Sequence, residues 1–316
     1  MLENYLDFEE PIAVLEKKIH ELQSSELLEP KTIEDQILKL NESAVKLTEK
    51  IYSNLSAWQN VQVARHPQRP HFLDYVEKLC DDFDELHGDR HYADDRAIIG
   101  GLASIGDHKV ILIGHEKGRS TEEKIKHNFG MAQPEGYRKA CRLMKTAERF
   151  NLPVVTLVDT PGAYPGIDSE ERGQSEAIAY NLSVMSSLKT PILVNIVGEG
   201  GSGGALALAV GDHISMMQYA TYSVASPEAC ASIVWRDSSK APDAAKAMKL
   251  NSENLLKLEL IDEILQEPLG GSHRHHEQAG LILKKSIIQN LNNLKKFKTV
   301  DLVERRYERL MGYGSL

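Results

Sequence analysis

The stretch NIVGEGGSGGALALAV, residues Asn195–Val210, places a glycine-rich loop between an apolar run and an alanine-rich segment. Within it, Gly198, Gly200 and Gly203 fit the pattern G-x-G-x-x-G. The run PILVNIV, which starts at Pro191, has the continuous apolar character of a strand buried on both faces of a parallel sheet. The stretch therefore predicts a strand–loop–helix unit of an α/β fold.

Three interpretations of this loop are open. A dinucleotide fingerprint normally opens the first βαβ unit and is followed about 20 residues later by an acid, but here the loop comes late and the next predicted strand, in HISMMQYATYSV, ends without an acid. A tight turn with close helix–strand packing is the purely structural alternative. The third is an oxyanion hole, because Gly203 and Gly204 precede a predicted helix whose first N–H groups have no internal partner and favour negative charge.

Composition limits the class of protein. The chain has 316 residues, 41% of them hydrophobic, which suffices for one large α/β domain or two small ones. Its net charge of -9 argues against bulk nucleic-acid binding. Cys80, Cys141 and Cys230 lack C-x-x-C spacing, so neither a zinc ribbon nor a disulfide framework is expected. Since no signal peptide or membrane-spanning run is evident, we expect a cytoplasmic chain without membrane contact.

Apolar residues at helical spacing over residues 11–58 predict two polar helices with a break near Pro30. Such a hairpin packs on the body of the protein or on another subunit. We divide the chain into the hairpin (1–63), a main domain (64–296) and a C-terminal tail (297–316). The predicted strands are 97–105, 109–115, the runs that begin at Pro153 and Pro191, and 213–217; the predicted helices are one from Pro134 that buries Ala140, Leu143, Met144 and Ala147, then 169–188, 227–235, 242–250 and, as the last helix, 277–295.

A second loop, DTPGAYPG at 159–166, also leaves the end of a predicted strand, one βα unit before the glycine loop. Ligands gather at the carboxyl ends of strands in parallel α/β folds. The backbone of Gly162 and Ala163 and the ring of Tyr164 are therefore candidates for the wall of a substrate pocket. Taken alone, this loop is a proline turn.

Both loops belong to an ordered series of motifs that runs from about Leu6 to the tail RRYERLMGYG. The series comprises LDFEEPI, ARHPQRP, ELHGDR, YADDRAIIGG, IGHEKGR, NFGM, PEGYRKA, DTPGAYPG, EERGQSEAIA, GEGGSGGALA, SPE and EPLGGSHR. Together they closely resemble the alpha subunits of bacterial acetyl-coenzyme A carboxylase carboxyltransferase. The resemblance implies a crotonase-like (ClpP-like) α/β fold of repeated ββα units, preceded by the helical hairpin.

The resemblance also implies partners and a reaction. It implies a beta subunit that carries the zinc, an α2β2 assembly, and a biotin carboxyl carrier protein with biotin carboxylase in the larger complex. The reaction would move a carboxyl group from carboxybiotin, delivered by the carrier rather than bound covalently here, to acetyl-CoA, giving malonyl-CoA for fatty acid synthesis. If carboxybiotin releases CO2, the biotin anion can itself remove the acetyl proton, so that the protein supplies placement and electrostatics.

The alpha subunits of this family supply the oxyanion hole for biotin and the beta subunits the hole for the thioester. We map the biotin hole onto Gly203 and Gly204, with Gly200 and Gly201 shaping the loop. No metal ligand is expected in this chain.

A cluster of basic residues follows the strand 109–115. Lys117 and Arg119 are the best candidates for contact with the CoA phosphates or the carrier protein, because they lie at a strand end. The alternative is a solvated face of mixed charge, since acidic residues are interspersed.

Two further motifs are weak. AMKL, Ala247–Leu250, nearly matches the AMKM around a biotinylated lysine, but its surroundings predict a helix instead of the exposed hairpin turn that an acceptor such as Lys249 requires. HRHH, His273–His276, could bind a metal, but without a second ligand cluster a polar loop is the expected structure.

Two rival functions stay open from the sequence alone. Glu199 and Glu176 could serve as acid and base in a stand-alone crotonase-type acyl-CoA hydratase. A non-catalytic scaffold that docks the beta subunit is the other alternative.

Overall fold

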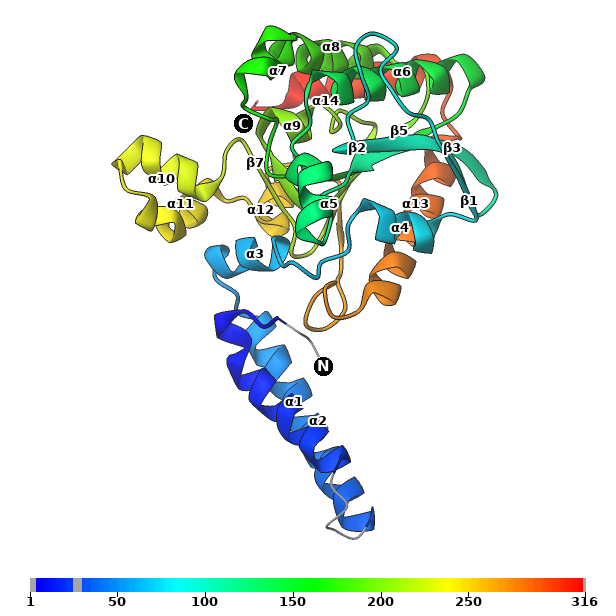
Figure 1. The fold of residues 1–316 in the computed structure, drawn as a ribbon. Helices are drawn as coiled ribbons and strands as arrows, with labels where there is room; N and C mark the ends of the chain where they lie inside the picture. The colour runs from blue at the N-terminus through cyan, green and yellow to red at the C-terminus, as the bar shows by residue number, and fades with distance from the viewer. Residues whose placement is uncertain (1–3, 25–29, 315–316) are drawn as a thin grey trace.

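The computed structural model describes residues 4–24 and 30–314. A mixed sheet with helices on both faces forms the body, and a long helical hairpin projects from it (Figure 1). The described strands form one sheet in the order β1-β2-β3-β4-β5-β6-β8, with β7 paired to β5. Their bounds are β1 Asp82–Glu85, β2 Ile98–Ile105, β3 His108–His115, β4 Val154–Thr160, β5 Ile192–Gly201, β6 His213–Met217, β7 Thr221–Ser223 and β8 Glu263–Leu265.

The central strands explain the apolar runs of the sequence. From β3 onward the pairings are parallel, whereas β1, β2 and β3 pair in antiparallel fashion. Every residue of β4 and β5 is buried, as expected for strands covered on both faces. The predicted α/β class is thus confirmed, and the predicted strands are confirmed within a few residues.

Helices cover both faces of the sheet (Figure 1). One side carries α6, α8 and α14, and the other carries α4 and α13. The described helices are α1 Glu10–Gln23, α2 Pro30–Tyr52, α3 Ala57–Ala64, α4 Phe72–Leu79, α5 Thr121–Lys126, α6 Pro134–Phe150, α7 Ile167–Glu171, α8 Gln174–Ser187, α9 Ser202–Leu206, α10 Pro227–Trp235, α11 Ala241–Met248, α12 Ser252–Lys257, α13 His276–Leu294 and α14 Thr299–Gly312, with 3-10 turns at η1 Asp7–Glu9, η2 Asn128–Gly130 and η3 Ser238–Lys240.

Local sequence accounts for several helix ends. Pro134 occupies the first turn of α6, where its missing N–H costs nothing. The four residues predicted for the buried face of α6 are all buried: Ala140, Leu143, Met144 and Ala147. The predicted helix over 169–188 is interrupted, because Gly173 adopts a left-handed conformation (φ 83°) between α7 and α8.

The N-terminal hairpin consists of α1 and α2, which confirms two helices in this region; the chain between them lies partly outside the described residues. Its base packs on the body through Ile12, Tyr52, Val63 and Tyr219. Glu9, fully buried, accepts a hydrogen bond of 2.7 Å from the Tyr52 hydroxyl. This contact fixes the two hairpin helices to each other where they meet the body.

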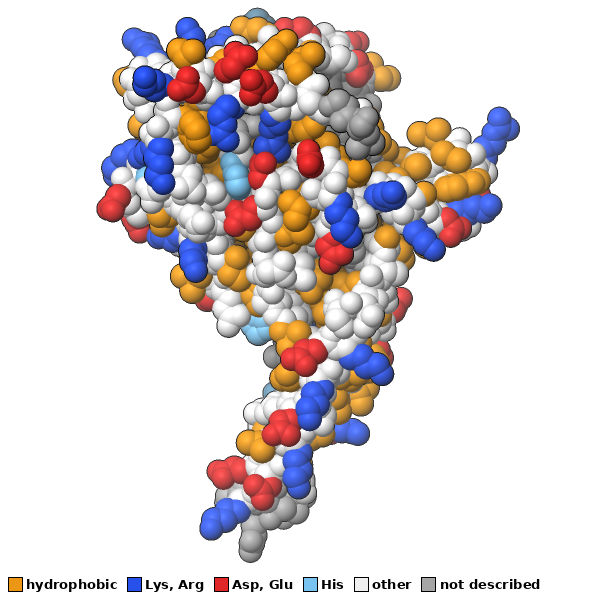
Figure 2. All heavy atoms as spheres, turned by 180° about the vertical axis from the view of Figure 1, so that it is seen from behind, with side chains coloured by type: hydrophobic (Ala, Val, Ile, Leu, Met, Phe, Trp, Pro, Cys, Tyr) orange, Lys and Arg blue, Asp and Glu red, His pale blue; other side chains and the backbone are white. Residues whose placement is uncertain are grey.

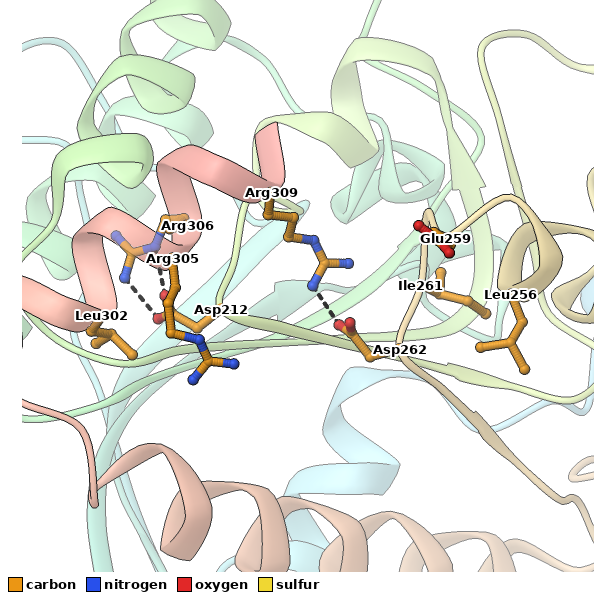
Figure 3. A pocket seen from close by; sticks show the side chains of 9 residues that line it. All are labelled: Asp212, Leu256, Glu259, Ile261, Asp262, Leu302, Arg305, Arg306 and Arg309. Carbon is orange, nitrogen blue, oxygen red and sulfur yellow. Dashed lines mark hydrogen bonds and ion pairs between the residues drawn. The ribbon is translucent and has the colours of Figure 1, made fainter. Parts of the chain in front are cut away.

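The predicted C-terminal tail is also helical, so the expectation that the last helix ends near 295 is wrong. Helix α14 packs against α8, and its Arg306 is buried. The Arg306 guanidinium donates to Asp212 at 2.7 Å (Figure 3). It also donates to the Met185 and Leu188 carbonyl oxygens. Neighbouring Arg309 pairs with Asp262 at 2.5 Å.

The α10–α11 pair projects from the body, and hydrophobic side chains lie along it (Figures 1 and 2). Ile233, Val234 and Trp235 are among its exposed residues. A group of exposed apolar side chains of this kind is typical of a surface that contacts another molecule. Among the helices of the described residues, none is both long and apolar enough to cross a membrane.

Candidate active site: two glycine loops at the carboxyl ends of β4 and β5

The structure brings the two predicted loops into direct contact. Because β4 and β5 are parallel neighbours, the loops that follow them leave the same edge of the sheet. A Cβ on Gly204 would lie 2.6 Å from the Ala163 nitrogen, and one on Gly201 would lie 2.2 Å from the Pro161 carbonyl oxygen. Only glycine permits this approach of main chain to main chain. The contact is one that the sequence did not predict.

The helix after the glycine loop is much shorter than expected. Helix α9 ends at Leu206, so ALALAV is helical only in its first two residues. Beyond it, the Ala207 carbonyl oxygen accepts from Asn181 and the Leu208 carbonyl oxygen accepts from the Thr156 hydroxyl. These side chains provide the hydrogen bonds that further helical turns would have made, and the chain turns into β6.

Gly203 and Gly204 are the second and third residues of α9. N–H groups at these positions have no partner inside a helix, and among the described residues no side chain caps this end of α9. Gly203 is half-buried and Gly204 is buried. Ser202, Gly203 and Leu206 form part of the wall of a mainly apolar cavity of about 360 Å³. The main chain at Gly203 therefore borders a space large enough for part of a small ligand.

The other predicted pocket residues lie in the loop after β4. Gly162 adopts φ 152°, a conformation that favours glycine. Tyr164 is half-buried; its N–H donates to the Ala132 carbonyl oxygen at 3.0 Å, and its own carbonyl oxygen accepts from Gln174 at 2.9 Å. These bonds fix the loop in place next to Gly204.

The two predicted basic residues are engaged within the protein. The Lys117 ammonium lies 2.5 Å from the Asp159 carboxylate and 3.8 Å from that of Glu199. Arg119 pairs with Asp74 and donates to the Arg69 carbonyl oxygen at 3.3 Å. Both cations thus connect elements around the glycine loops.

Sequence reasoning missed three charged or titratable residues beneath the loops. Asp159, the next-to-last residue of β4, is 2% exposed and accepts the Glu199 N–H; the only signal for it was its place at the start of DTPG. Arg65 donates to Glu199 at 2.7 Å. His115, at the end of β3, lies near the main chain of Gly204, and burial lowers its pKa to about 4, so its imidazole is neutral at pH 7.

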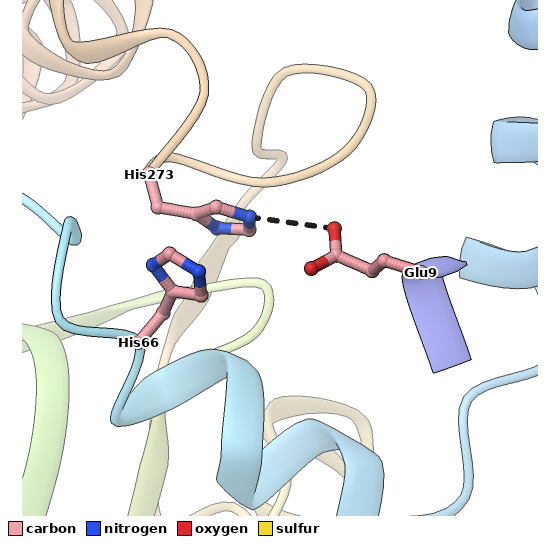
Figure 4. A group of neighbouring side chains, drawn as sticks. All are labelled: Glu9, His66 and His273. Carbon is pink, nitrogen blue, oxygen red and sulfur yellow. Dashed lines mark ion pairs between the residues drawn. The ribbon is translucent and has the colours of Figure 1, made fainter. Parts of the chain in front are cut away.

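A histidine cluster lies at the hairpin base, where His66 and His273 approach Glu9 (Figure 4). HRHH is a loop up to His275, as expected, but its His273 is buried. The rings of His273 and His66 stack with centroids 4.0 Å apart. His273 Nε2 lies 3.6 Å from Glu9 Oε1. His66 and Glu9 are ligand candidates that sequence inspection of HRHH had not found.

This cluster does not fit a metal ion. His66 Nδ1 accepts from the Gln68 N–H at 3.1 Å, so Nε2 carries the ring proton and donates to the Asn4 carbonyl oxygen at 3.0 Å. Neither nitrogen of His66 then offers a lone pair, and stacked rings do not aim their lone pairs at one point. The Glu9 carboxylate already accepts from Tyr52 and from the Leu6 N–H.

A second group, Glu85, His87 and Asp94, is near the surface. The ammonium of Lys139 lies 2.6 Å from the Asp94 carboxylate, so this carboxylate already has a cationic partner within the protein.

Two other candidates are placed by the structure. Lys249 follows α11 as its C-terminal cap, not on a hairpin turn, as the helical interpretation of AMKL expected. Glu199 is held by Arg65 and Lys117, whereas Glu176 is exposed on α8. The Glu199 carboxylate is thus engaged in two ion pairs within the protein, whereas the base of a hydratase must reach a proton of the substrate.

Solved structures share this fold. The transcarboxylase 12S core matches with a TM-score of 0.60 at 17% identity, over 73% of this chain and 42% of that one. A Pseudomonas malonate decarboxylase hetero-tetramer in complex with coenzyme A matches with a TM-score of 0.59 at 14% identity, over 74% of this chain and 91% of that one. The chain thus shares the α/β fold of these solved structures.

Curated relatives define the family more narrowly. The chain is 58% identical over 312 residues to the acetyl-coenzyme A carboxylase carboxyl transferase subunit alpha of Chromohalobacter salexigens, covering 99% of this chain and 98% of the relative. It is 56% identical over 314 residues to the subunit of that name from Vibrio cholerae, covering 98% of each. The acetyl co-enzyme A carboxylase carboxyltransferase-like family matches residues 5–314, and the chain belongs to it.

Proposed function

We propose that this chain is the alpha subunit of an acetyl-CoA carboxylase carboxyltransferase. With a beta subunit, it would transfer the carboxyl group of carboxybiotin to acetyl-CoA and form malonyl-CoA for fatty acid synthesis. The observation that carries the proposal is the 58% identity to a curated alpha subunit over 99% of the chain.

The geometry of the loops supports a role in electrostatic stabilisation. The N–H groups of Gly203 and Gly204, at the start of α9, are the proposed oxyanion hole for the ureido oxygen of biotin, and Gly200 and Gly201 shape the loop. Gly162, Ala163 and Tyr164 would form the adjoining wall. Preorganised donors of this kind need no reorganisation as charge develops, and losing one costs about 3 kcal/mol in the barrier.

The fold favours a structural role for Lys117 and Arg119. Their ion pairs with Asp159 and Asp74 favour a role in holding the loops over a direct contact with CoA phosphates. Among the described residues at the loops, the carboxylates of Asp159 and Glu199 are engaged in ion pairs, which fits a substrate that carries its own base, the biotin anion.

The partner structure of the enzyme follows from the same proposal. The beta subunit, which would hold the zinc and the hole for the thioester, would join this chain in an α2β2 assembly. The exposed apolar side chains of the α10–α11 pair, such as Ile233, suit a subunit contact. A biotin carboxyl carrier protein would deliver carboxybiotin, and biotin carboxylase would belong to the larger complex.

The organisation and location of the chain are part of the proposal. Residues 1–63 would serve subunit packing, and residues 64–296 would form the carboxyltransferase domain. Residues 297–316 would be a C-terminal tail whose helix α14 packs against α8 of the main domain. The cytoplasm, a reducing compartment, is the proposed location of the chain.

Assays of the purified chain test the proposal. Carboxyl transfer is measured with the chain alone, with the beta subunit, and with the beta subunit plus Gly203→Val. Activity should require both subunits and an unobstructed Gly203. A chain that hydrates enoyl-CoA alone would instead be a hydratase, and a complex that keeps full activity with Gly203→Val would reduce the chain to a scaffold.

A further inference from the structure

The pairing of β4 with β5 is interrupted beside the glycine loop. The register runs from Val154↔Ile192 to Val158↔Ile196 and resumes only at Thr160↔Gly200. Asp159 therefore stands alone on β4 opposite Val197, Gly198 and Glu199 of β5. Such a bulge leaves main-chain groups without their ladder partners and re-aims the residues that follow.

The Asp159 carboxylate replaces the missing ladder bond. Its Oδ1 accepts the Glu199 N–H at 2.8 Å and lies 2.5 Å from the Lys117 ammonium. A Cβ on Gly198 would lie 2.3 Å from the same oxygen, so glycine at this position makes room for the carboxylate. At the bulge, the Asp159 side chain thus accepts the main-chain N–H that a carbonyl oxygen of the neighbouring strand would accept in a regular ladder.

The remaining bulge residues are fixed from other elements. Buried Arg69 donates from Nε to the Val197 carbonyl oxygen at 2.8 Å and pairs with Glu267. The Glu199 carboxylate is held by Arg65 at 2.7 Å and by Lys117. Val197 and Glu199 are therefore each held by groups outside β5, and Asp159, the next-to-last residue of β4, also stands directly before the loop that follows this strand.

We infer that Asp159 is a positioning residue, whose buried carboxylate sets the placement of the Gly203 and Gly204 N–H groups by fixing the bulge at Glu199. The inference rests on the proposed function, because it assigns Asp159 to the proposed oxyanion hole. From the bulge the chain runs directly into Gly200, Gly201 and α9, so a shift at Glu199 is carried to the donors. A misplacement of about 1 Å can cost on the order of 100-fold in rate.

The test uses the assembled complex with its beta subunit. Transfer of the carboxyl group from malonyl-CoA to free biotin is measured, with kcat and the KM of each substrate. Asp159→Ala should lower kcat on the order of 100-fold while the KM for malonyl-CoA stays unchanged, because the thioester side is untouched. Asp159→Asn keeps an oxygen for the Glu199 N–H and should lose less. Equal losses in the two variants would overturn the assignment to that N–H.

Asp212 offers a matched control at the opposite end of β5. Its carboxylate is buried, accepts the Ile192 N–H at 2.7 Å and pairs with Arg306 at 2.7 Å, so it has the same kinds of bond as Asp159. Asp212→Asn should lower the melting temperature without lowering kcat. If it lowers kcat as much as Asp159→Asn does, the role of Asp159 is purely structural and the inference fails.

The outcomes separate this inference from the proposed function. Where Asp159→Ala does not assemble, the comparison of Asp159→Asn with Asp212→Asn decides. An inactive Gly203→Val complex beside fully active Asp159 variants would overturn the role of Asp159 alone. Full activity of Gly203→Val would overturn the oxyanion hole itself.

Discussion

Gly204 faces the peptide that joins Gly162 to Ala163 so closely that a Cβ at residue 204 would lie 2.6 Å from the Ala163 nitrogen. The neighbouring Gly203 has room, because its Cβ would meet only the Ile178 side chain, at 3.7 Å. The two glycines therefore serve different purposes. Gly204 permits close contact between the loops, and Gly203 leaves main chain uncovered at the cavity.

Substitution should separate these two purposes. Gly203→Val should keep the melting temperature and assembly with the beta subunit, but lower carboxyl transfer by about 100-fold or more by covering a donor. Gly204→Val should lower stability by about 1–3 kcal/mol or more, because rigid backbone must shift. Thermal unfolding and transfer assays on both variants check this. A Gly203→Val chain as unstable as Gly204→Val would contradict it.

Arg306 should be the strongest single anchor of α14. Removing it leaves the buried Asp212 carboxylate without its partner, which typically costs about 3–5 kcal/mol. Arg306→Ala should therefore lower the free energy of unfolding by that amount in urea titrations. Arg305→Ala is the control on the same helix: Arg305 is exposed and stacks on Phe297, with 4.0 Å to the ring centroid, a contact worth about 1 kcal/mol or less. Equal losses in the two variants would contradict the burial argument.

The strands of the sheet and the helices between them could be predicted from the sequence, because each of them has a pattern of apolar residues within its own segment. Buried parallel strands appear as apolar runs, and the face of α6 that contains Ala140 and Leu143 appears as helical spacing. The resemblance to a family then predicted how these elements assemble, because an ordered series of motifs identifies one family, whereas a single G-x-G-x-x-G occurs in many.

Features that depend on distant partners could not be predicted. Arg306 lies in the charged segment RRYERLMGYG, and it is buried only because Asp212, 94 positions earlier, lies beneath it. His273 lies in a polar stretch and is buried against His66. The bulge at Asp159 arises from the pairing of two strands, and neither strand alone encodes it. Periodicity within one segment carries no information on such contacts.

The base of the hairpin should weaken in acid. Burial, and then the nearby His273, lower the pKa of His66 from 6.5 to about 4, while Glu9 raises it and Arg69 lowers it further. Between pH 6.5 and 4 the unfolded chain therefore binds a proton at this residue that the folded chain does not, so stability falls as pH falls through this window. The full effect is about 3 kcal/mol.

Glu9 extends the same trend to lower pH. Burial raises its pKa, but the nearby His273 and the hydrogen bonds from the Leu6 N–H and the Tyr52 hydroxyl outweigh burial and lower the pKa from 4.5 to about 2. Its stabilisation is present above pH 4.5 and is lost as pH falls toward 2. Urea unfolding at pH 7 and 4.5 should show less loss on acidification for His66→Gln than for the unsubstituted chain. His20→Gln, at an exposed position on α1, is the control and should keep the full loss; an unchanged loss in His66→Gln would refute the assignment.

Gly198 and Asp159 should be energetically coupled. Gly198 is outside the left-handed region, so Gly198→Ala is resisted only by the lack of space, with the new Cβ placed 2.3 Å from the Asp159 oxygen. Each single variant should destabilise the chain, but Asp159→Ala removes the atom that Gly198→Ala would strike. The double variant should therefore be more stable than the sum of the singles predicts, by about 0.5–3 kcal/mol. Gly211→Ala, whose Cβ would meet Val194 at 2.8 Å near the start of β5, should combine additively with Asp159→Ala. Additivity in both pairs, measured by urea unfolding, would show that the Asp159 carboxylate does not occupy the space beside Gly198.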